Sequence, residues 1–180
     1  MTGDRVFFVI QALLKYVAFE WAVALRGWLY RPFFRRFGQG VKILDGVVIK
    51  YPSQIELGDH VRINEGCYIT GKGGLSIGDE VMIGAGSKIT TGLHGIALDR
   101  PMQRQPMLER AVRIGSDVWL GFDVKVLAGS TIGNGVVIAA GSVVPGKAIP
   151  DYAIVAGVPA RVLRLRTDPG AAEDLDDAAG

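Results

Sequence analysis

Histidine and cysteine, which often perform acid–base or nucleophilic chemistry, are scarce in this chain of 180 residues, which contains two histidines and one cysteine. A neutral imidazole such as that of His94 can take a proton from a hydroxyl group near pH 7 and later give it to a leaving group. A solvated loop histidine is the alternative interpretation of His94, and His60 fits a surface position at a turn. The sequence therefore offers one candidate general base, and its surroundings must decide its role.

The same scarcity limits disulfide and metal chemistry. Because Cys67 is the one cysteine, an internal disulfide bond is impossible. One cysteine and two histidines cannot form a structural zinc site by themselves, so we expect no metal ion.

The composition is that of a folded protein, with 49% hydrophobic and 21% charged residues. The net charge is +2, and the dense basic patch with aromatic residues that nucleic-acid binding requires is missing, so we expect no nucleic-acid partner. Residues 167–180 carry five acidic residues and no basic one, which predicts an acidic, disordered tail.

A six-residue repeat dominates residues 57–144 and must position His94. A second, small or β-branched residue follows most of the aliphatic positions by four residues, and Cys67 occupies one of these sites. Each unit supplies one short strand and one corner, so three units close one turn of a three-sided coil with the aliphatic side chains inside. An inward Cys67 disfavours a covalent acyl-cysteine. The aliphatic positions are Leu57, Ile63, Ile69, Ile77, Ile83, Ile89, Ile114, Leu120, Val126, Ile132, Ile138 and Val144.

The repeat is interrupted where His94 lies. Coils begin at residues 57, 77, 114 and 132, so the middle step of 37 residues contains nineteen more than an ideal coil of eighteen. This surplus, residues 91–111, is expected to leave the coil as one long loop. Long loops on a rigid scaffold commonly carry function, which favours His94 as a catalytic residue.

The pattern Leu/Ile/Val-Gly-x-x-Val/Ser over residues 41–166 resembles the hexapeptide-repeat acyltransferases, and among them the sugar and polysaccharide O-acetyltransferases. The resemblance implies an all-β fold, a left-handed parallel β-helix, for one transferase domain spanning 41–166. It also implies a homotrimer and acetyl-CoA, or another acyl-CoA, as the donor substrate. In this family the long loop begins with the catalytic histidine, and Thr90-Thr91-Gly92-Leu93-His94 stands at the matching position.

The resemblance also indicates residues on the acceptor side of the site. Asn64 matches an asparagine that holds the acceptor and the reacting oxygen, with a simple corner residue as the alternative. Trp119 matches an outward tryptophan that forms a wall for the acceptor or the pantetheine arm, with packing against a neighbouring subunit as the alternative. Eight residues after Asn64 the small-sugar enzymes carry Asp, whereas this chain has Lys72, which argues against a maltose- or galactoside-like acceptor.

The donor side falls in the last coil. Gly121 and Ala140 are small, so that an extended pantetheine arm has room near the backbone. The run Ala156-Gly-Val-Pro-Ala-Arg161-Val-Leu-Arg164 resembles the closing motif of the family, whose two arginines contact the coenzyme A phosphates. Arg161 and Arg164 match these arginines, or they form a generic basic end. Lys147 takes the place of a family lysine one position earlier.

Residues 1–40 form a separate segment with a predicted amphipathic helix between residues 6 and 30. Apolar residues recur there at spacings of three and four, among them Trp21 and Trp28, while Gln11 and Arg26 belong to a narrow opposite strip. The helix either packs on its own fold or trimer, or it lies in a membrane interface through residues 6–30. The internal charges of the segment argue against a cleaved signal peptide.

These observations predict an acyltransferase that moves an acetyl or short acyl group from acyl-CoA to a hydroxyl of a sugar or surface-glycan precursor. His94 acts as the general base, assisted by Asn64. The location expected is cytoplasmic, with or without contact to the inner face of the membrane. Acetylation of a non-sugar small molecule such as an antibiotic, and a non-catalytic β-helix interaction module, are the alternatives.

Overall fold

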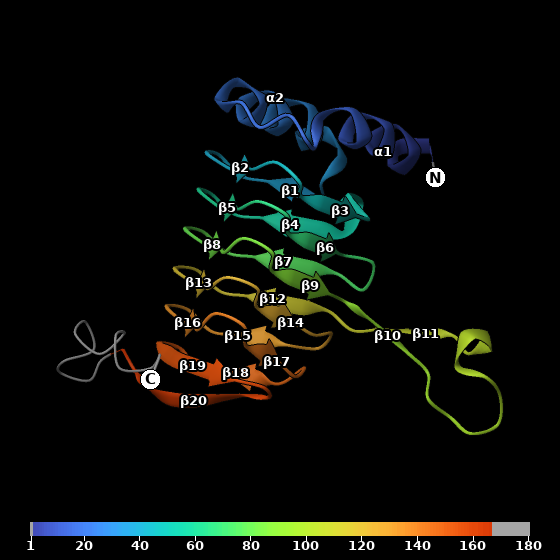
Figure 1. The fold of residues 1–180 in the computed structure, drawn as a ribbon, viewed down its shortest axis with the longest axis vertical. Coiled ribbons are helices and arrows are strands. Elements are labelled where there is room, and N and C mark those ends of the chain that lie inside the picture. Colours follow the sequence, from blue (N-terminus) through green and yellow to red (C-terminus); the bar gives the residue numbers. More distant parts are fainter. Residues whose placement is uncertain (1, 167–180) are drawn as a thin grey trace.

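The computed structural model describes residues 2–166 and shows a three-sided prism of stacked coils with two helices across one end (Figure 1). The predicted tail, residues 167–180, lies outside the described residues. Strands stack in parallel on each of the three faces, and two antiparallel pairs depart from this rule, β10 with β11 and β19 with β20.

The faces are named here first, second and third in the order in which the chain meets them. The first face contains β1 (Arg36–Phe37), β4 (Ile55–Leu57), β7 (Leu75–Ile77), β12 (Val112–Ile114), β15 (Thr131–Ile132) and β18 (Ala148–Ile149). The second contains β2 (Lys42–Ile43), β5 (Arg62–Ile63), β8 (Met82–Ile83), β13 (Trp119–Leu120), β16 (Val137–Ile138), β19 (Ala153–Gly157) and β20 (Ala160–Leu165). The third contains β3 (Val48–Lys50), β6 (Tyr68–Thr70), β9 (Lys88–Thr90), β14 (Lys125–Val126) and β17 (Val143–Val144).

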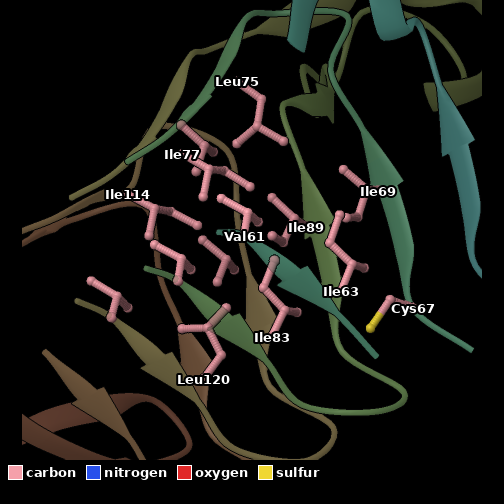
Figure 2. Close-up of a cluster of buried hydrophobic side chains, with 14 of the residues drawn as sticks. Val61, Ile63, Cys67, Ile69, Leu75, Ile77, Ile83, Ile89, Ile114 and Leu120 are labelled. Carbon is pink, nitrogen blue, oxygen red and sulfur yellow. The ribbon is translucent and has the colours of Figure 1, made fainter. Parts of the chain in front are cut away.

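The core of the prism is the predicted aliphatic repeat. All twelve repeat positions are at most 4% exposed, and Figure 2 shows several of them, including Ile63, Ile83 and Leu120, directed into the interior. Ile77 pairs with Ile114 across the 37-residue step, which confirms that the surplus residues leave the stack. The small inward residue that the repeat predicts four positions after Val144 is Ala148, and this prediction is wrong. Ala148 is exposed and Ile149 is buried instead, because the last coil is one residue shorter than the others.

At one corner of the prism, polar side chains of each coil form hydrogen bonds to the backbone of the preceding coil. The carboxylate of Asp59 accepts a hydrogen bond from the backbone of Gln39, and that of Asp79 accepts one from Asp59, both at 2.8 Å. Ser116, Asn134 and Asp151 continue the column at 2.7–3.0 Å. These bonds give partners to backbone N–H groups that the short strands leave unpaired at the corner.

The amino-terminal segment forms two helices rather than the single helix expected between residues 6 and 30. These are α1 (Thr2–Leu14) and α2 (Glu20–Tyr30), and the 3₁₀ turn η1 (Arg31–Phe33) leads into β1. We call α1, α2 and η1 the helical cap, because they cover the first coil (Figure 1). Among the described residues, neither helix has the length and apolar content to cross a membrane.

The cap packs on the prism through the narrow strip that contains Gln11 and Arg26, together with Phe7 and Tyr30. Gln11, Ala22 and Arg26 are buried, whereas Trp21 and Trp28 are exposed. Gln11 donates to the carbonyl of Ile49 and accepts from its N–H group. Backbone N–H and C=O groups at the edge of the first coil have no further strand to pair with. Polar side chains of the helices provide their hydrogen-bond partners instead.

Candidate functional site

The loop that carries His94 is an ordered β-hairpin outside the prism. It consists of β10 (Gly92–His94) and β11 (Met107–Glu109), paired antiparallel with His94 opposite Met107, and the 3₁₀ turn η3 (Met102–Arg104) lies near its tip. Figure 1 shows the hairpin projecting away from the stack. The imidazole of His94 is exposed, so it is open to a substrate or to a second chain.

Buried and paired polar groups fix the base of this hairpin. Thr91 is fully buried, and its hydroxyl donates to the carbonyl of Thr70 at 3.0 Å and accepts from the N–H of Gly73 at 2.9 Å. Lys72 Nζ and Glu109 Oε1 lie 2.7 Å apart at the end of β11. The hydrogen bond to Glu109 raises the pKa of Lys72, so the ammonium group of this ion pair stays charged until the pH rises through the lysine range.

A second anchor lies within the hairpin itself. Gln105 is 8% exposed, and its amide donates to the carbonyls of Ala97 and Arg100 at 2.8 Å and accepts from the N–H of Ala97 at 2.9 Å. Sequence reasoning missed both Thr91 and Gln105, because a single polar residue whose partners are distant backbone groups leaves no periodic signal. The two anchors explain how a loop of this length holds His94 in one place.

Asn64 lies half-buried at the end of β5 on the second face. Its side-chain oxygen accepts a hydrogen bond from Arg62 Nε at 3.0 Å, and its backbone N–H pairs with Ile83. The guanidinium of Arg62, which the sequence did not single out, fixes the orientation of the amide. Because Arg62 occupies the oxygen, the amide N–H₂ is the group that Asn64 can offer to a substrate.

Trp119 points outward from β13, as the repeat predicts, while the adjacent Leu120 is fully buried. It pairs in register with Met82 on one side and Val137 on the other, and Met82 pairs with Arg62. The indole and the thioether are both exposed, so the outer side of the second face carries two apolar side chains next to the Arg62–Asn64 pair.

A single chain does not bring the acceptor-side residues to His94. The hairpin leaves the prism after β9 of the third face and projects to one side, whereas β5 and β13 of the second face lie on the other side (Figure 1). Segments separated in such a view are separated in space. A site that uses His94 together with Asn64 and Trp119 therefore needs these residues from two chains.

Arg161 and Arg164 lie on β20 at the end of the prism opposite to the cap (Figure 1). Arg161 pairs with Ala156 and Arg164 with Ile154, and the register shifts by one residue between them. Three residues apart on a regular strand, the two side chains would point to opposite faces; the bulge places them on the same face. Two guanidinium groups on one face suit a ligand with several phosphates.

The other donor-side candidates differ in their surroundings. Gly121 is buried against the next coil, where a Cβ atom would lie 2.7 Å from the backbone nitrogen of Ala140, so close packing of coils accounts for this glycine. Ala140 and Lys147 are exposed at corners of the last coils. At the adjacent Gly141 an added Cβ would meet nothing within 4 Å, which leaves open space along this corner.

Cys67 is buried in the core, and its Sγ donates to the carbonyl of Gly84. Burial raises the pKa of the thiol to about 11, so the thiolate needed for nucleophilic attack is not populated near neutral pH. This supports the expectation that Cys67 forms no acyl intermediate. Within residues 2–166, no three His, Cys, Asp or Glu side chains are grouped as metal ligands.

Residues 111–146 match the model of the bacterial transferase hexapeptide family (six repeats). A putative colanic acid biosynthesis acetyltransferase, WcaF of Escherichia coli K12, is 33% identical over 152 residues, which cover 84% of this chain and 79% of WcaF. WbbJ of the same organism, a putative lipopolysaccharide biosynthesis O-acetyl transferase, is 48% identical over 64 residues. That match covers 36% of this chain and only about a third, 32%, of WbbJ.

Among solved structures, the hexapeptide-repeat acetyltransferase VCA0836 of Vibrio cholerae, in complex with acetyl coenzyme A, superimposes with a TM-score of 0.82. It is 28% identical, and the match covers 93% of this chain and 88% of that one. The chain therefore belongs to the hexapeptide-repeat acetyltransferase family. The predicted fold class, a left-handed parallel β-helix of hexapeptide repeats, is confirmed.

Proposed function

We propose that the protein transfers an acetyl or short acyl group from acyl-CoA to a hydroxyl of a sugar or surface-glycan precursor. The observation that carries the proposal is His94, exposed on a hairpin whose base is locked by Thr91 and by the Lys72–Glu109 pair. Because this imidazole lies outside the core of the prism, it does not contribute to the packing of the prism. The match to WcaF over most of both chains supports a glycan acceptor.

The reaction is direct transfer. His94 takes the proton of the acceptor hydroxyl while its oxygen attacks the thioester carbonyl, which gives a tetrahedral oxyanion. The amide N–H₂ of Asn64 is suited to donate to the developing oxyanion or to the acceptor. When the intermediate collapses, the C–S bond breaks and the imidazolium returns its proton to the thiolate. The products are the acylated acceptor and free coenzyme A.

We propose that the active unit is a homotrimer with three sites between neighbouring chains. The separation of the hairpin from Asn64 and Trp119 within one chain supports this arrangement. The exposed column of Met82 and Trp119 on the second face supplies an apolar surface for the neighbouring hairpin, whose exposed Leu108 and Ile96 are also apolar. A closed ring of three such contacts leaves no hairpin and no second face unpaired.

On the donor side, Arg161 and Arg164 bind the phosphates of acyl-CoA, and the open corner at Ala140, close to Gly121, accommodates the pantetheine arm. Lys147 is a further cation for the phosphates. On the acceptor side, Trp119 forms a wall. Lys72 is engaged by Glu109 in holding the hairpin, which supports an acceptor bound differently from maltose or a galactoside.

The proposal is tested by mixing the purified protein with acetyl-CoA and a panel of sugar, nucleotide-sugar and antibiotic acceptors, and measuring thiol release. We expect acceptor-dependent release of coenzyme A with a sugar hydroxyl and ester formation in the product by mass spectrometry. Turnover with antibiotics alone would contradict the glycan acceptor. Absence of any binding of coenzyme A, measured by calorimetry, would contradict the transferase function altogether.

A further inference from the structure

The outer side of the helical cap is an apolar surface with no cover in the structure. We call it the cap face. Leu13 and Trp28 are each 74% exposed, values typical of charged rather than apolar side chains. The exposed members, from α1, the connecting turn and α2, are Val6, Phe8, Val9, Leu13, Tyr16, Phe19, Trp21 and Trp28.

The cap face looks outward because buried polar groups hold the helices in this orientation. Arg26 is 1% exposed and donates to the carbonyls of Ile43, Leu14 and Val17 at 2.8–3.0 Å. On the same inner side the rings of Phe7 and Tyr30 pack edge to face, with centroids 5.0 Å apart. A helix on the surface of a protein in water normally directs its apolar side inward and its polar side outward. Here the inner side holds Gln11 and Arg26 beside Phe7 and Tyr30, and the outer side is apolar as well, so the cap face requires a cover.

A neighbouring chain of the proposed trimer does not supply this cover. The inference rests on the proposed function at this one point, because the trimer contacts run sideways from the hairpin to the second face. The cap lies at the end of the prism instead (Figure 1). Prisms that contact one another sideways around a three-fold axis direct their three cap faces to the same side of the assembly. Three copies of the surface then act together.

The chemistry of the cap face fits a lipid surface. Tyr16, Trp21 and Trp28 combine an apolar ring with a polar edge, the kind of side chain that favours the boundary between lipid and water. Arg5 and Arg31 are exposed cations of the cap and the exposed Arg36 follows it on β1, whereas the acids among the described residues of the cap are the exposed Glu20 and the partly exposed Asp4. This balance is complementary to anionic headgroups.

An apolar groove lies beside α2 and shares Trp28 with the cap face. It has a volume of about 640 Å³ and is lined by Ile10, Trp28, Leu29, Arg31, Pro32 and Phe33. Arg31 is the one charged residue of the lining, so the groove offers a single cation at the edge of an apolar channel. A lipid acyl chain with its phosphate at the rim has this distribution of charge.

We propose that the protein docks peripherally on an anionic lipid bilayer through the cap face. The aromatic and aliphatic side chains enter the headgroup region, and Arg5, Arg31 and Arg36 contact lipid phosphates. The cap lies on the bilayer and does not cross it. A protein partner and a second copy of the trimer are the competing occupants of the cap face.

The test is sedimentation of the full-length protein with vesicles of phosphatidylcholine alone and of phosphatidylcholine mixed with phosphatidylglycerol. We expect binding to the mixed vesicles that is weakened by salt. The double variant Leu13→Glu/Trp28→Glu should lower this binding by about tenfold or more, because two carboxylates replace inserted apolar groups. Leu163→Glu is the matched control: Leu163 is 58% exposed at the opposite end of the prism and should bind vesicles like the unaltered protein.

Each result decides the proposal. Both altered side chains are exposed, so the double variant should keep the unfolding temperature, and Arg31→Gln/Arg36→Gln provides a second variant that should weaken the preference for anionic lipid. Absence of vesicle binding by the unaltered protein, or equal binding by the double variant, would overturn it. Light scattering that shows hexamers dispersed by the double variant would instead assign the cap face to a second trimer. His94→Ala protein should bind vesicles normally, so failure of docking and failure of the proposed catalysis are distinguishable.

Discussion

The hairpin and the helical cap are both additions to the same prism, and both are attached by polar groups. Thr91 and the Lys72–Glu109 pair hold the hairpin, and Arg26 and Gln11 hold the cap. They differ in what they expose. The hairpin presents an imidazole, which suits a chemical step, whereas the cap presents aromatic and aliphatic side chains, which suit adhesion. Under the two proposals above, the scaffold carries the reaction on an insertion between two coils and the docking surface on the segment that precedes its first coil.

The largest effect is expected from His94→Ala. Loss of a positioned general base should lower turnover by roughly two to four orders of magnitude. Folding and coenzyme A binding should not change, because the side chain is exposed and lies outside the core. Steady-state thiol release and calorimetry measure the two quantities. A near-normal rate would show that His94 is not the general base. The contrast between a catalytic hairpin and an adhesive cap would then be contradicted.

Arg26→Ala should have the next largest effect, on stability. It removes a buried guanidinium and leaves three carbonyl groups without their donor, which should cost about 2–4 kcal/mol in the free energy of unfolding. Denaturant unfolding measures the loss. The matched control is Arg31→Ala, an exposed residue at the end of the same cap, which should change stability by less than about 0.5 kcal/mol. Equal effects of the two changes would show that the cap is held by packing alone.

Lys72→Ala should have the smallest effect and should act on the rate. The Lys72–Glu109 pair is exposed, so its removal should leave the unfolding temperature nearly unchanged. A looser hairpin should lower turnover by about twofold to tenfold, because misplacement of a catalytic group is costly. Lys72→Arg retains the pair and should restore the rate. An increase in KM for the acceptor with unchanged turnover would assign Lys72 to acceptor binding instead.

The prism and the position of the hairpin could be predicted from the sequence because both determine the spacing of the aliphatic residues along the chain. Inward residues such as Ile83 and Leu120 recur every six residues, and a step of 37 residues in which the repeat is lost over residues 91–111 indicates a coil with an excursion. The orientation of the bulge that aligns Arg161 with Arg164 could not be predicted, since one extra residue in a short strand has no signature of its own.

The cap could not be predicted for a different physical reason. Hydrophobic periodicity locates the apolar side of a helix, but it does not say whether that side meets protein or something else. The sequence therefore left open whether the apolar side packs on the fold or lies in a membrane interface, and it did not reveal that Gln11 and Arg26 hydrogen-bond to backbone groups of the first coil. The break between α1 and α2 at residues 15–19 contains neither glycine nor proline, so the sequence offered no signal for it.

The central claim is that one chain contributes His94 and its neighbour contributes Asn64. It is tested most directly by co-expressing His94→Ala and Asn64→Ala chains with different affinity tags and isolating the mixed assemblies. In a mixed trimer, either composition contains one intact pair among three sites, so we expect about one third of the unaltered activity per assembly. If the mixed assemblies are no more active than either variant alone, the site lies within one chain and the account is contradicted.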